Sequence, residues 1–280
     1  MKLATRFSTR TSILSAHGNA PLEDSAIRAA APSIFADSRH SSRSDRYTYI
    51  PTSNILTGLR REGFQPYQVV QGGSRIEGKA DFTKHMIRLR HPDISRTGTG
   101  ETPELILINS HDGTSSYQLL AGLVRFVCFN GLVCGDELGE VRVPHRGDIV
   151  GQVIDGCVQL VKDIPYVLDS VASFKSLTLT DGEQRAFATA AHATRFEADS
   201  PVQADKLLTP KRSEDATSDL WAVFNRVQEN VIRGGTGYVQ NSPTQGRSFR
   251  RTREVKSIDQ TVGINRALWV LAEEMKKLKA

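Results

Sequence analysis

The sequence predicts an α+β fold, in which an antiparallel β-sheet with packed helices is followed by a mainly helical C-terminal part. Two observations predict it: short β-prone segments crowd the chain before residue 147, and apolar residues recur at helical spacing from residue 148 onward. The 280 residues, of which 39% are hydrophobic and 24% charged, suffice to bury such a core. We expect a loosely ordered N-terminal arm, an α+β core and a helical C-terminal region with an Arg-rich loop, at residues 1–45, 46–147, 148–280 and 241–256.

The elements of the predicted core follow from its apolar spacing and its turn residues. Ile55, Leu56 and Leu59 predict a helix that Gly63 ends. Strands are expected next, and a polar turn at 110–116 is expected to lead into a helix over 117–126. The expected strands cover residues 64–71, 82–90, 104–109, 132–134 and 141–146.

The predicted C-terminal region consists of four helices. Apolar residues at helical spacing predict the first over 148–174, with a kink at Pro165. Thr180 and Glu183 have the spacing of a capping box at the start of the second, and Asp219 caps the third. The second to fourth helices are expected over residues 181–196, 220–233 and 258–278.

Several protein classes are excluded by composition and motifs. No stretch approaches eighteen uninterrupted apolar residues, and the N-terminal cations precede no apolar segment, so neither a membrane span nor a secretory signal is expected. The three cysteines form no CxxC pair and are expected to be buried thiols in a reducing cytoplasm. The GxxxxGK[ST], GxGxxG and GxSxG motifs are absent, so no cofactor is expected.

Basic residues gather in the early strands. Residues 43–96 hold ten Lys or Arg against five acids, an excess that equals the net charge of +5 for the whole chain. Lys84, Arg88 and Arg90 recur at alternate positions of one strand and should face solvent or a ligand. They form either a solubilising sheet face or a phosphate track, because alternate strand positions lie about 6.6 Å apart, near the phosphate spacing of an extended single strand.

The phosphate-track hypothesis defines a set of nucleic-acid-binding residues. Tyr67 and Phe82 are candidates for stacking on bases. His85 and His111 lie among the cations and complete the first group. The candidate phosphate contacts are Arg60, Arg61, Lys79, Lys84, Arg88 and Arg90. The basic residues expected to form a second nucleic-acid contact or a subunit contact are Arg247, Arg250, Arg251 and Arg253.

The segment 109–115 is the most polar constellation in the chain, and three interpretations stay open. His111 and Asp112 could bind a metal or act as acid and base, although no HxH or HExxH pattern supplies partners. Asp112 or a following hydroxyl could simply cap the next helix, which is the favoured interpretation. Backbone N–H groups at that helix start could also bind a phosphate with help from His111.

The chain resembles a family of prophage- and plasmid-borne proteins, the phage/plasmid-like group, which is named only as a domain of unknown function. The similarity runs from about residue 30 to the end. It implies a mobile-element origin and a bacterial cytoplasm, and it supplies no activity. The motifs that carry it are residues 47–52, 83–88, 108–115, 126–132, 220–230 and 265–269.

A second resemblance, over about residues 47–131, is to recombination-mediator annealases such as Red beta. In that group a short helix precedes a Gly-aromatic strand entry, here 52–61 and Gly63-Phe64. The resemblance implies a cationic groove for single-stranded DNA and assembly into rings or helical filaments. The large helical C-terminal part departs from that pattern.

We therefore expect a non-enzymatic, cytoplasmic protein that binds single-stranded DNA and promotes annealing as a homo-oligomer, without cofactor, metal or membrane. Two alternatives remain: an interaction protein that inhibits a host defence system, and a metal-dependent nuclease centred on His111 and Asp112.

Overall fold

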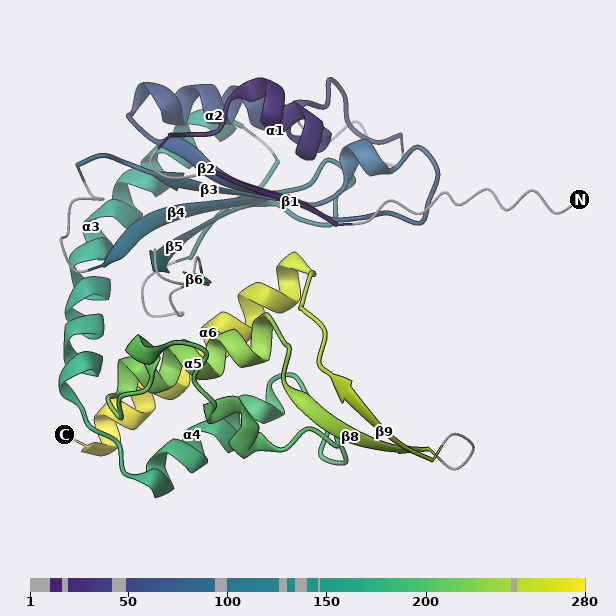
Figure 1. Ribbon diagram of the computed structural model, residues 1–280. Coiled ribbons are helices and arrows are strands. Elements are labelled where there is room, and N and C mark those ends of the chain that lie inside the picture. The colour runs from purple at the N-terminus through teal and green to yellow at the C-terminus, as the bar shows by residue number, and fades with distance from the viewer. Residues whose placement is uncertain are drawn as a thin grey trace, which may run out of the picture. The chain divides into compact units, whose positions relative to one another are not determined.

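The computed structural model describes residues 11–16, 20–41, 49–93, 100–125, 130–133, 140–145, 147–242 and 246–279. The fold is α+β with an antiparallel sheet and a mainly helical C-terminal part, which confirms the predicted class (Figure 1). The chain divides into two compact units, formed among the described residues by those up to 164 and those from 165 onward. That division falls inside α3 (Ile149–Ser176).

The first unit contains a seven-stranded sheet in the order β1-β2-β3-β4-β5-β6, with β7 also paired to β5. All pairings are antiparallel, and β6 and β7 share one edge of β5 because they pair with its C-terminal and N-terminal halves. The strands are β1 (Ser12–Ser15), β2 (Gln65–Gln71), β3 (His85–Arg90), β4 (Glu101–Asn109), β5 (Tyr117–Arg125), β6 (Asn130–Val133) and β7 (Glu140–Val143).

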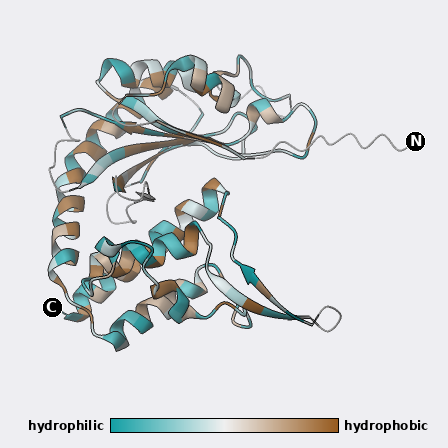
Figure 2. Cartoon of the chain, viewed as in Figure 1, coloured by the Kyte–Doolittle hydropathy of each residue, from teal (hydrophilic) through white to brown (hydrophobic). Residues whose placement is uncertain are grey.

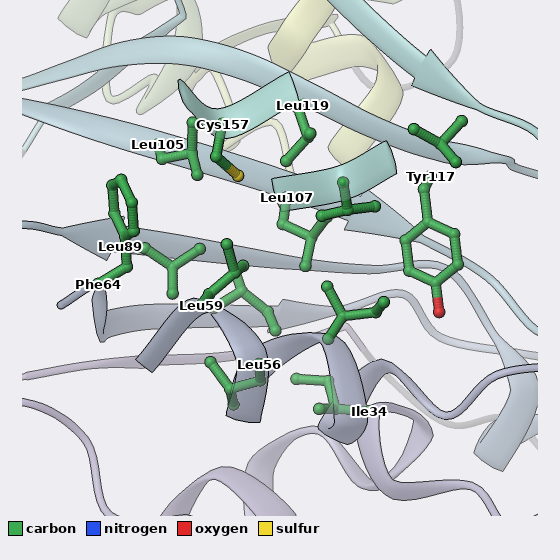
Figure 3. Close-up of a cluster of buried hydrophobic side chains, with 14 of the residues drawn as sticks. Ile34, Leu56, Leu59, Phe64, Leu89, Leu105, Leu107, Tyr117, Leu119 and Cys157 are labelled. Atoms are coloured by element: carbon green, nitrogen blue, oxygen red, sulfur yellow. The ribbon is translucent and has the colours of Figure 1, made fainter. Parts of the chain in front are cut away.

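One face of this sheet forms the core of the unit. Val69, Ile87, Leu107 and Leu119 stand directly opposite one another across four neighbouring strands, and all four are fully buried. Helix α2 (Thr52–Arg61) packs its Ile55, Leu56 and Leu59 on the same core, as the apolar spacing predicts. Figure 3 shows Leu59 directed at the side chains of the strands.

The N-terminal segment differs from the predicted loose arm in its described parts. Strand β1 extends the sheet, and α1 (Asp24–Ala30) with the 3-10 helix η1 (Pro32–Phe35) covers it. Ile27, Ala31 and Ile34 are fully buried in the core. Their spacing of four and three residues is a short apolar stripe within a Ser-, Ala- and Arg-rich segment.

The predicted helix over 117–126 is wrong, because residues 117–125 form β5. Its run of apolar residues fits a buried helix and a buried strand equally well. Pairing with β4 on one side and with β6 and β7 on the other decides in favour of the strand. The turn at 110–116 therefore joins two strands and caps no helix.

The second unit is mainly helical. Thr180 and Glu183 form the predicted capping box of α4, and Asp219 caps α5 by accepting a hydrogen bond from the Ala222 N–H. The predicted Arg-rich loop is instead a β-hairpin. The elements are the C-terminal part of α3, α4 (Asp181–Ala193), η4 (Ala204–Leu208), η5 (Ser213–Asp215), α5 (Leu220–Ile232), β8 (Gly237–Ser242), β9 (Gly246–Arg251) and α6 (Ile258–Lys279).

Two sequence expectations concern the environment of the chain. Among the described residues, we find no helix with the length and apolar character needed to cross a membrane. Cys157 is a buried free thiol, as expected, and burial raises its pKa to about 12. Cys128 and Cys134 lie outside the described residues.

Candidate nucleic-acid interface

Arg88 and Arg90, two of the predicted phosphate contacts, are paired with one carboxylate of the neighbouring strand. Arg88 Nη1 lies 2.7 Å from Glu104 Oε2, and Arg90 Nε lies 2.8 Å from Glu104 Oε1. Arg88 stands opposite Ile106, so Glu104 is its diagonal neighbour on the same sheet face. The Arg88 side chain is only 4% exposed. The expectation that it faces solvent or a ligand is therefore wrong, since a buried ion pair compensates its charge.

Two further predicted contacts of the early strands are also engaged in ion pairs. Arg60 Nη2 lies 2.7 Å from Asp24 Oδ1, and Lys79 Nζ lies 3.1 Å from Asp112 Oδ2. Arg61 is exposed, and Lys84 is half-buried. Two of these four side chains are thus engaged by carboxylates, and the four come from α2, from the start of η2 (Ala80–Phe82) and from the residue before β3.

The predicted stacking residues have neighbours of their own. The Arg90 guanidinium lies over the ring of Tyr67, 4.2 Å from its centroid. Phe82 meets the ring of His40 edge-on at 5.4 Å between centroids. One face of Tyr67 is therefore occupied by a cation–π contact.

His85 belongs to a buried hydrogen-bond network between the sheet and its helices. His85 Nε2 lies 2.9 Å from Thr52 Oγ1, and His85 Nδ1 lies 2.9 Å from Ser33 Oγ. The Ser33 hydroxyl donates to Gln71 Oε1 at 2.7 Å, so it accepts from a protonated His85 Nδ1. The Thr52 hydroxyl then donates to the bare His85 Nε2, and the neutral imidazole satisfies both partners.

Thr52 is the centre of this network. Its hydroxyl oxygen accepts from Asn109 Nδ2 at 3.1 Å and lies 3.2 Å from His111 Nε2. Since the Thr52 proton is given to His85, His111 Nε2 is the donor in its contact. His145 Nε2 lies 3.0 Å from Asn109 Oδ1 and extends the chain of bonds to the end of β7. His111 Nδ1 is left buried without a hydrogen-bond partner among the described residues.

Burial controls the protonation of these histidines. Burial, with the nearby His111 acting in the same direction, lowers the pKa of His85 to about 3. Burial and the neighbouring His145 lower the pKa of His111 to about 4. Both rings are therefore neutral at physiological pH and cannot act as phosphate-binding cations. Their place in the network joins α2, η1 and the sheet.

Asp112 stabilises the turn between β4 and β5. Its Oδ1 accepts from the Thr114 N–H at 3.0 Å and from the Thr114 hydroxyl at 2.6 Å. Burial would raise its pKa, but the hydrogen bonds from Thr114 and Lys79 outweigh burial and hold the pKa below its ordinary value. Among the described residues, no group of three or more His, Cys, Asp or Glu is arranged to hold a metal ion.

The β8–β9 hairpin brings the second predicted set of arginines together on an exposed surface. Arg247, Arg250 and Arg251 are exposed, and no ion pair is found for their side chains among the described residues. No Asp or Glu occurs anywhere from residue 230 to 253. Figure 2 shows β9 mostly in the hydrophilic colours, whereas strands of the large sheet carry long hydrophobic stretches.

Phe249 is the aromatic member of this basic surface. It lies between Arg247 and Arg251 at alternate positions of β9, so the three side chains share one face of the hairpin. Its side chain is 69% exposed. An exposed aromatic ring flanked by two unopposed arginines is an arrangement that binds stacked bases and phosphates.

Comparison with known proteins places the chain among proteins of unknown function. The family described as "Domain of unknown function (DUF932)" matches residues 39–269. The chain belongs to the DUF932 family. Two similar relatives from Escherichia coli (strain K12) are UPF0380 protein YafZ, 46% identical, and UPF0380 protein YfjQ, 45% identical, each over 275 residues covering 98% of this chain and 97% of the relative. No solved structure matches.

The matched part of this DUF932 protein contains both structural features described above. Residues 39–269 include most of the histidine network and the whole described hairpin. The predicted membership of a family of unknown function is thus confirmed.

Sequence reasoning identified the hairpin arginines but not Phe249. Arg247, Phe249 and Arg251 occupy alternate positions, and this two-residue period is the sequence signal that indicates a strand with all three side chains on one face. The network residues Ser33, Thr52, Gln71 and Asn109 gave no such signal, because their partners are 33 to 59 residues away in sequence.

Proposed function

We propose that this DUF932 protein binds single-stranded DNA, with the β8–β9 hairpin as its principal contact, and that it promotes annealing of complementary strands as a homo-oligomer. The observation that carries the proposal is the exposed face of β9, on which Arg247, Phe249 and Arg251 alternate without an opposing acid among the described residues. Arg250 and the exposed Arg253 add positive charge from neighbouring positions.

The spacing of this face suits an extended single strand. Residues two apart in a strand are separated by about 6.6 Å, close to the distance between phosphates of a stretched polynucleotide. The two arginines can each neutralise a phosphate, and the ring between them offers a surface on which any base can stack. Binding of this kind reads no sequence, because every base has a flat face.

Annealing is supported by the same charge distribution. Two complementary strands repel each other through their phosphates, and arginines that bind the backbone reduce that repulsion. The order of α2 followed by antiparallel β2, β3 and β4 fits the sequence pattern over about residues 47–131 on which we base the resemblance to recombination-mediator annealases, and it adds support to annealing. We further propose that the protein serves a mobile genetic element in the bacterial cytoplasm, as the resemblance of its sequence motifs to the phage/plasmid-like group implies.

The decisive experiment compares salt-dependent binding of a fluorescent oligothymidine of about 30 nucleotides to the wild-type protein and to the triple variant Arg247→Gln, Arg250→Gln, Arg251→Gln. For single strands the slope of log K against log salt is about −0.7 per phosphate contact, so the variant should lose about 2 from the slope. Affinity at low salt should fall at least tenfold. A flat salt response of the wild-type protein would overturn the proposal.

A matched control removes the same charge elsewhere. The control is the triple variant Arg75→Gln, Lys162→Gln, Arg185→Gln, which removes three exposed cations from separate parts of the chain and leaves the hairpin cations in place. It should keep the wild-type slope. Equal losses in both triple variants would show that net charge, and not the hairpin, carries binding.

Annealing and assembly have their own measurements. Two complementary labelled strands should pair faster with the wild-type protein than without it, and the hairpin triple variant should not accelerate pairing. Mass photometry with and without oligonucleotide tests the homo-oligomer. A protein that retains no oligonucleotide but captures a defined host defence protein would instead support the interaction-protein alternative.

A further inference from the structure

A pocket of about 650 Å³ opens at the foot of the β8–β9 hairpin, within the second unit. Its basic lining consists of Lys206, Lys211 and Arg247, and none of the described residues that line it is acidic. Ligand pockets commonly measure about 300–1,000 Å³, so this one has room for much more than an inorganic anion. Its charge selects an anionic ligand.

Other lining groups select a ligand with a flat ring and hydrogen-bonding edges. Phe249 and Tyr238 line the pocket from the hairpin, and Thr209, Asn230 and Thr236 contribute hydroxyl and amide groups. Aromatic faces bind planar rings by stacking, and amides and hydroxyls bind the donors and acceptors at ring edges. A phosphate, a sugar and a base combine these features in one molecule.

Thr236 supplies an independent sign of a missing ligand. It is 7% exposed, and its hydroxyl has no hydrogen-bond partner among the described residues. Its backbone is already fixed, since its N–H donates to Thr252 Oγ1 at 3.1 Å and its carbonyl accepts from the Thr252 N–H at 2.9 Å. A buried hydroxyl without a partner is unfavourable, and a ligand atom in the pocket would satisfy it.

One of the pocket cations, Lys211, is held in place by the protein. Lys211 Nζ donates to the Gly234 carbonyl at 2.7 Å. Burial is the main cause that lowers the Lys211 pKa, and the nearby Arg212 and Arg233 act in the same direction. A bound phosphate would offset both effects.

We infer that this pocket binds one nucleotide of a single strand, with its base on the ring of Phe249 and its phosphate at the pocket cations. Arg247 belongs both to the pocket and to the exposed face of β9, so a strand that follows β9 reaches the pocket without leaving the protein. The choice of a nucleotide as the ligand rests on the proposed function.

The test is to titrate the full chain separately with thymidine monophosphate, thymidine and inorganic phosphate. Binding is monitored through the shifts of the backbone amide NMR signals. Thymidine monophosphate should shift signals at Thr236 and Phe249 saturably, and at least fivefold more tightly than either fragment. The variant Thr236→Val should weaken thymidine monophosphate at least fivefold. The control Thr189→Val, at an exposed position of α4, should leave it unchanged.

Each opposite outcome overturns the inference. If inorganic phosphate binds as tightly as thymidine monophosphate, the pocket is only an anion site. If thymidine monophosphate causes no shift, the pocket is not a nucleotide site. Because Thr236→Val introduces an apolar group at a buried position, Phe249→Leu at its exposed position gives a second variant that should lose thymidine monophosphate binding. If oligothymidine binds through the hairpin arginines while thymidine monophosphate does not bind, the pocket inference fails and the proposed function stands. If thymidine monophosphate binds while oligothymidine does not, the proposed function fails and the pocket is a site for a free nucleotide.

Discussion

The ring of Phe249 on β9 lies against the backbone of Gly237 on β8, so closely that a Cβ atom at position 237 would stand 2.5 Å from Phe249 Cζ. Gly237 pairs with Arg251 and Phe249 with Val239, so the ring reaches diagonally across the hairpin. The glycine thereby fixes the position of an aromatic ring that is otherwise mostly exposed. The proposed DNA contact therefore depends on a residue without a side chain.

Gly237→Ala should displace the Phe249 ring without changing any charge. We expect oligothymidine affinity to fall about threefold to tenfold, because a stacked base contributes about 1–3 kcal/mol and only part of it is lost. The salt slope should stay at the wild-type value, since the arginines remain. Fluorescence anisotropy measures both. Gly263→Ala, in α6 with no heavy atom within 4 Å of the added Cβ, is the control and should bind as the wild-type protein does.

Glu104→Gln should destabilise the first unit strongly. It removes the carboxylate that pairs with the buried Arg88 and with Arg90, and breaking a buried pair typically costs about 3–5 kcal/mol. Urea unfolding measures the change in the free energy of unfolding. The double variant Arg88→Met, Glu104→Met should be destabilised less than Glu104→Gln. Glu104→Gln takes the Glu104 carboxylate from two guanidinium groups, whereas the double variant takes it from that of Arg90 alone.

The same variants separate the two candidate DNA surfaces. If the early strands carried DNA binding, the double variant at Arg88 and Glu104 would bind oligothymidine with a reduced salt slope. We expect the folded double variant to keep the wild-type slope, as the hairpin is unchanged. A reduced slope would return the interface to the sheet.

Thr52→Val should cost about 2–4 kcal/mol of unfolding free energy, although it preserves the shape of the side chain. The Thr52 hydroxyl forms hydrogen bonds with His85, Asn109 and His111. Each buried polar group that is left without a partner costs about 1–3 kcal/mol. Thr57→Val in the same helix is the control, because its exposed hydroxyl bonds only to the Ser53 carbonyl among the described residues. Equal losses in both variants would contradict a central role for Thr52.

Much of the fold could be predicted because its signals are local. The stripe of Ile55, Leu56 and Leu59 defines α2 within ten residues, and the Thr180–Glu183 pair marks the start of α4 within four. β5 could not be assigned in this way, because only its partners β4, β6 and β7 decide between helix and strand.

The candidate site was harder to predict for a related reason. The charge of Arg88 is visible in the sequence, but the carboxylate that pairs with it is 16 residues away and becomes a neighbour only through the register of β3 and β4. No ion pair is found for the hairpin arginines among the described residues, and their own segment contains no acid. Local composition therefore identified the exposed cations of the hairpin, where the surrounding chain holds no carboxylate, but not the burial of Arg88.

Acid should destabilise the protein through His85 and His111 before its carboxylates titrate. Their pKa values are about 3 and about 4 in the folded protein, against about 6.5 in an unfolded chain. Between these values the unfolded chain binds more protons, so the free energy of unfolding falls as the pH drops below about 6.5, and the fall ends near the folded pKa values.

Each histidine contributes a slope of at most about 1.4 kcal/mol per pH unit, which gives a loss of about 2–4 kcal/mol between pH 6.5 and 5. Urea unfolding at pH 7.5, 6.5 and 5 measures it. The variant His85→Gln should show a slope reduced by about half, whatever its stability at pH 7.5, because one of the two buried groups no longer takes up a proton on unfolding. A free energy of unfolding that stays constant from pH 7.5 to 5 would mean that both rings reach solvent in the folded protein, contrary to the buried network around Thr52.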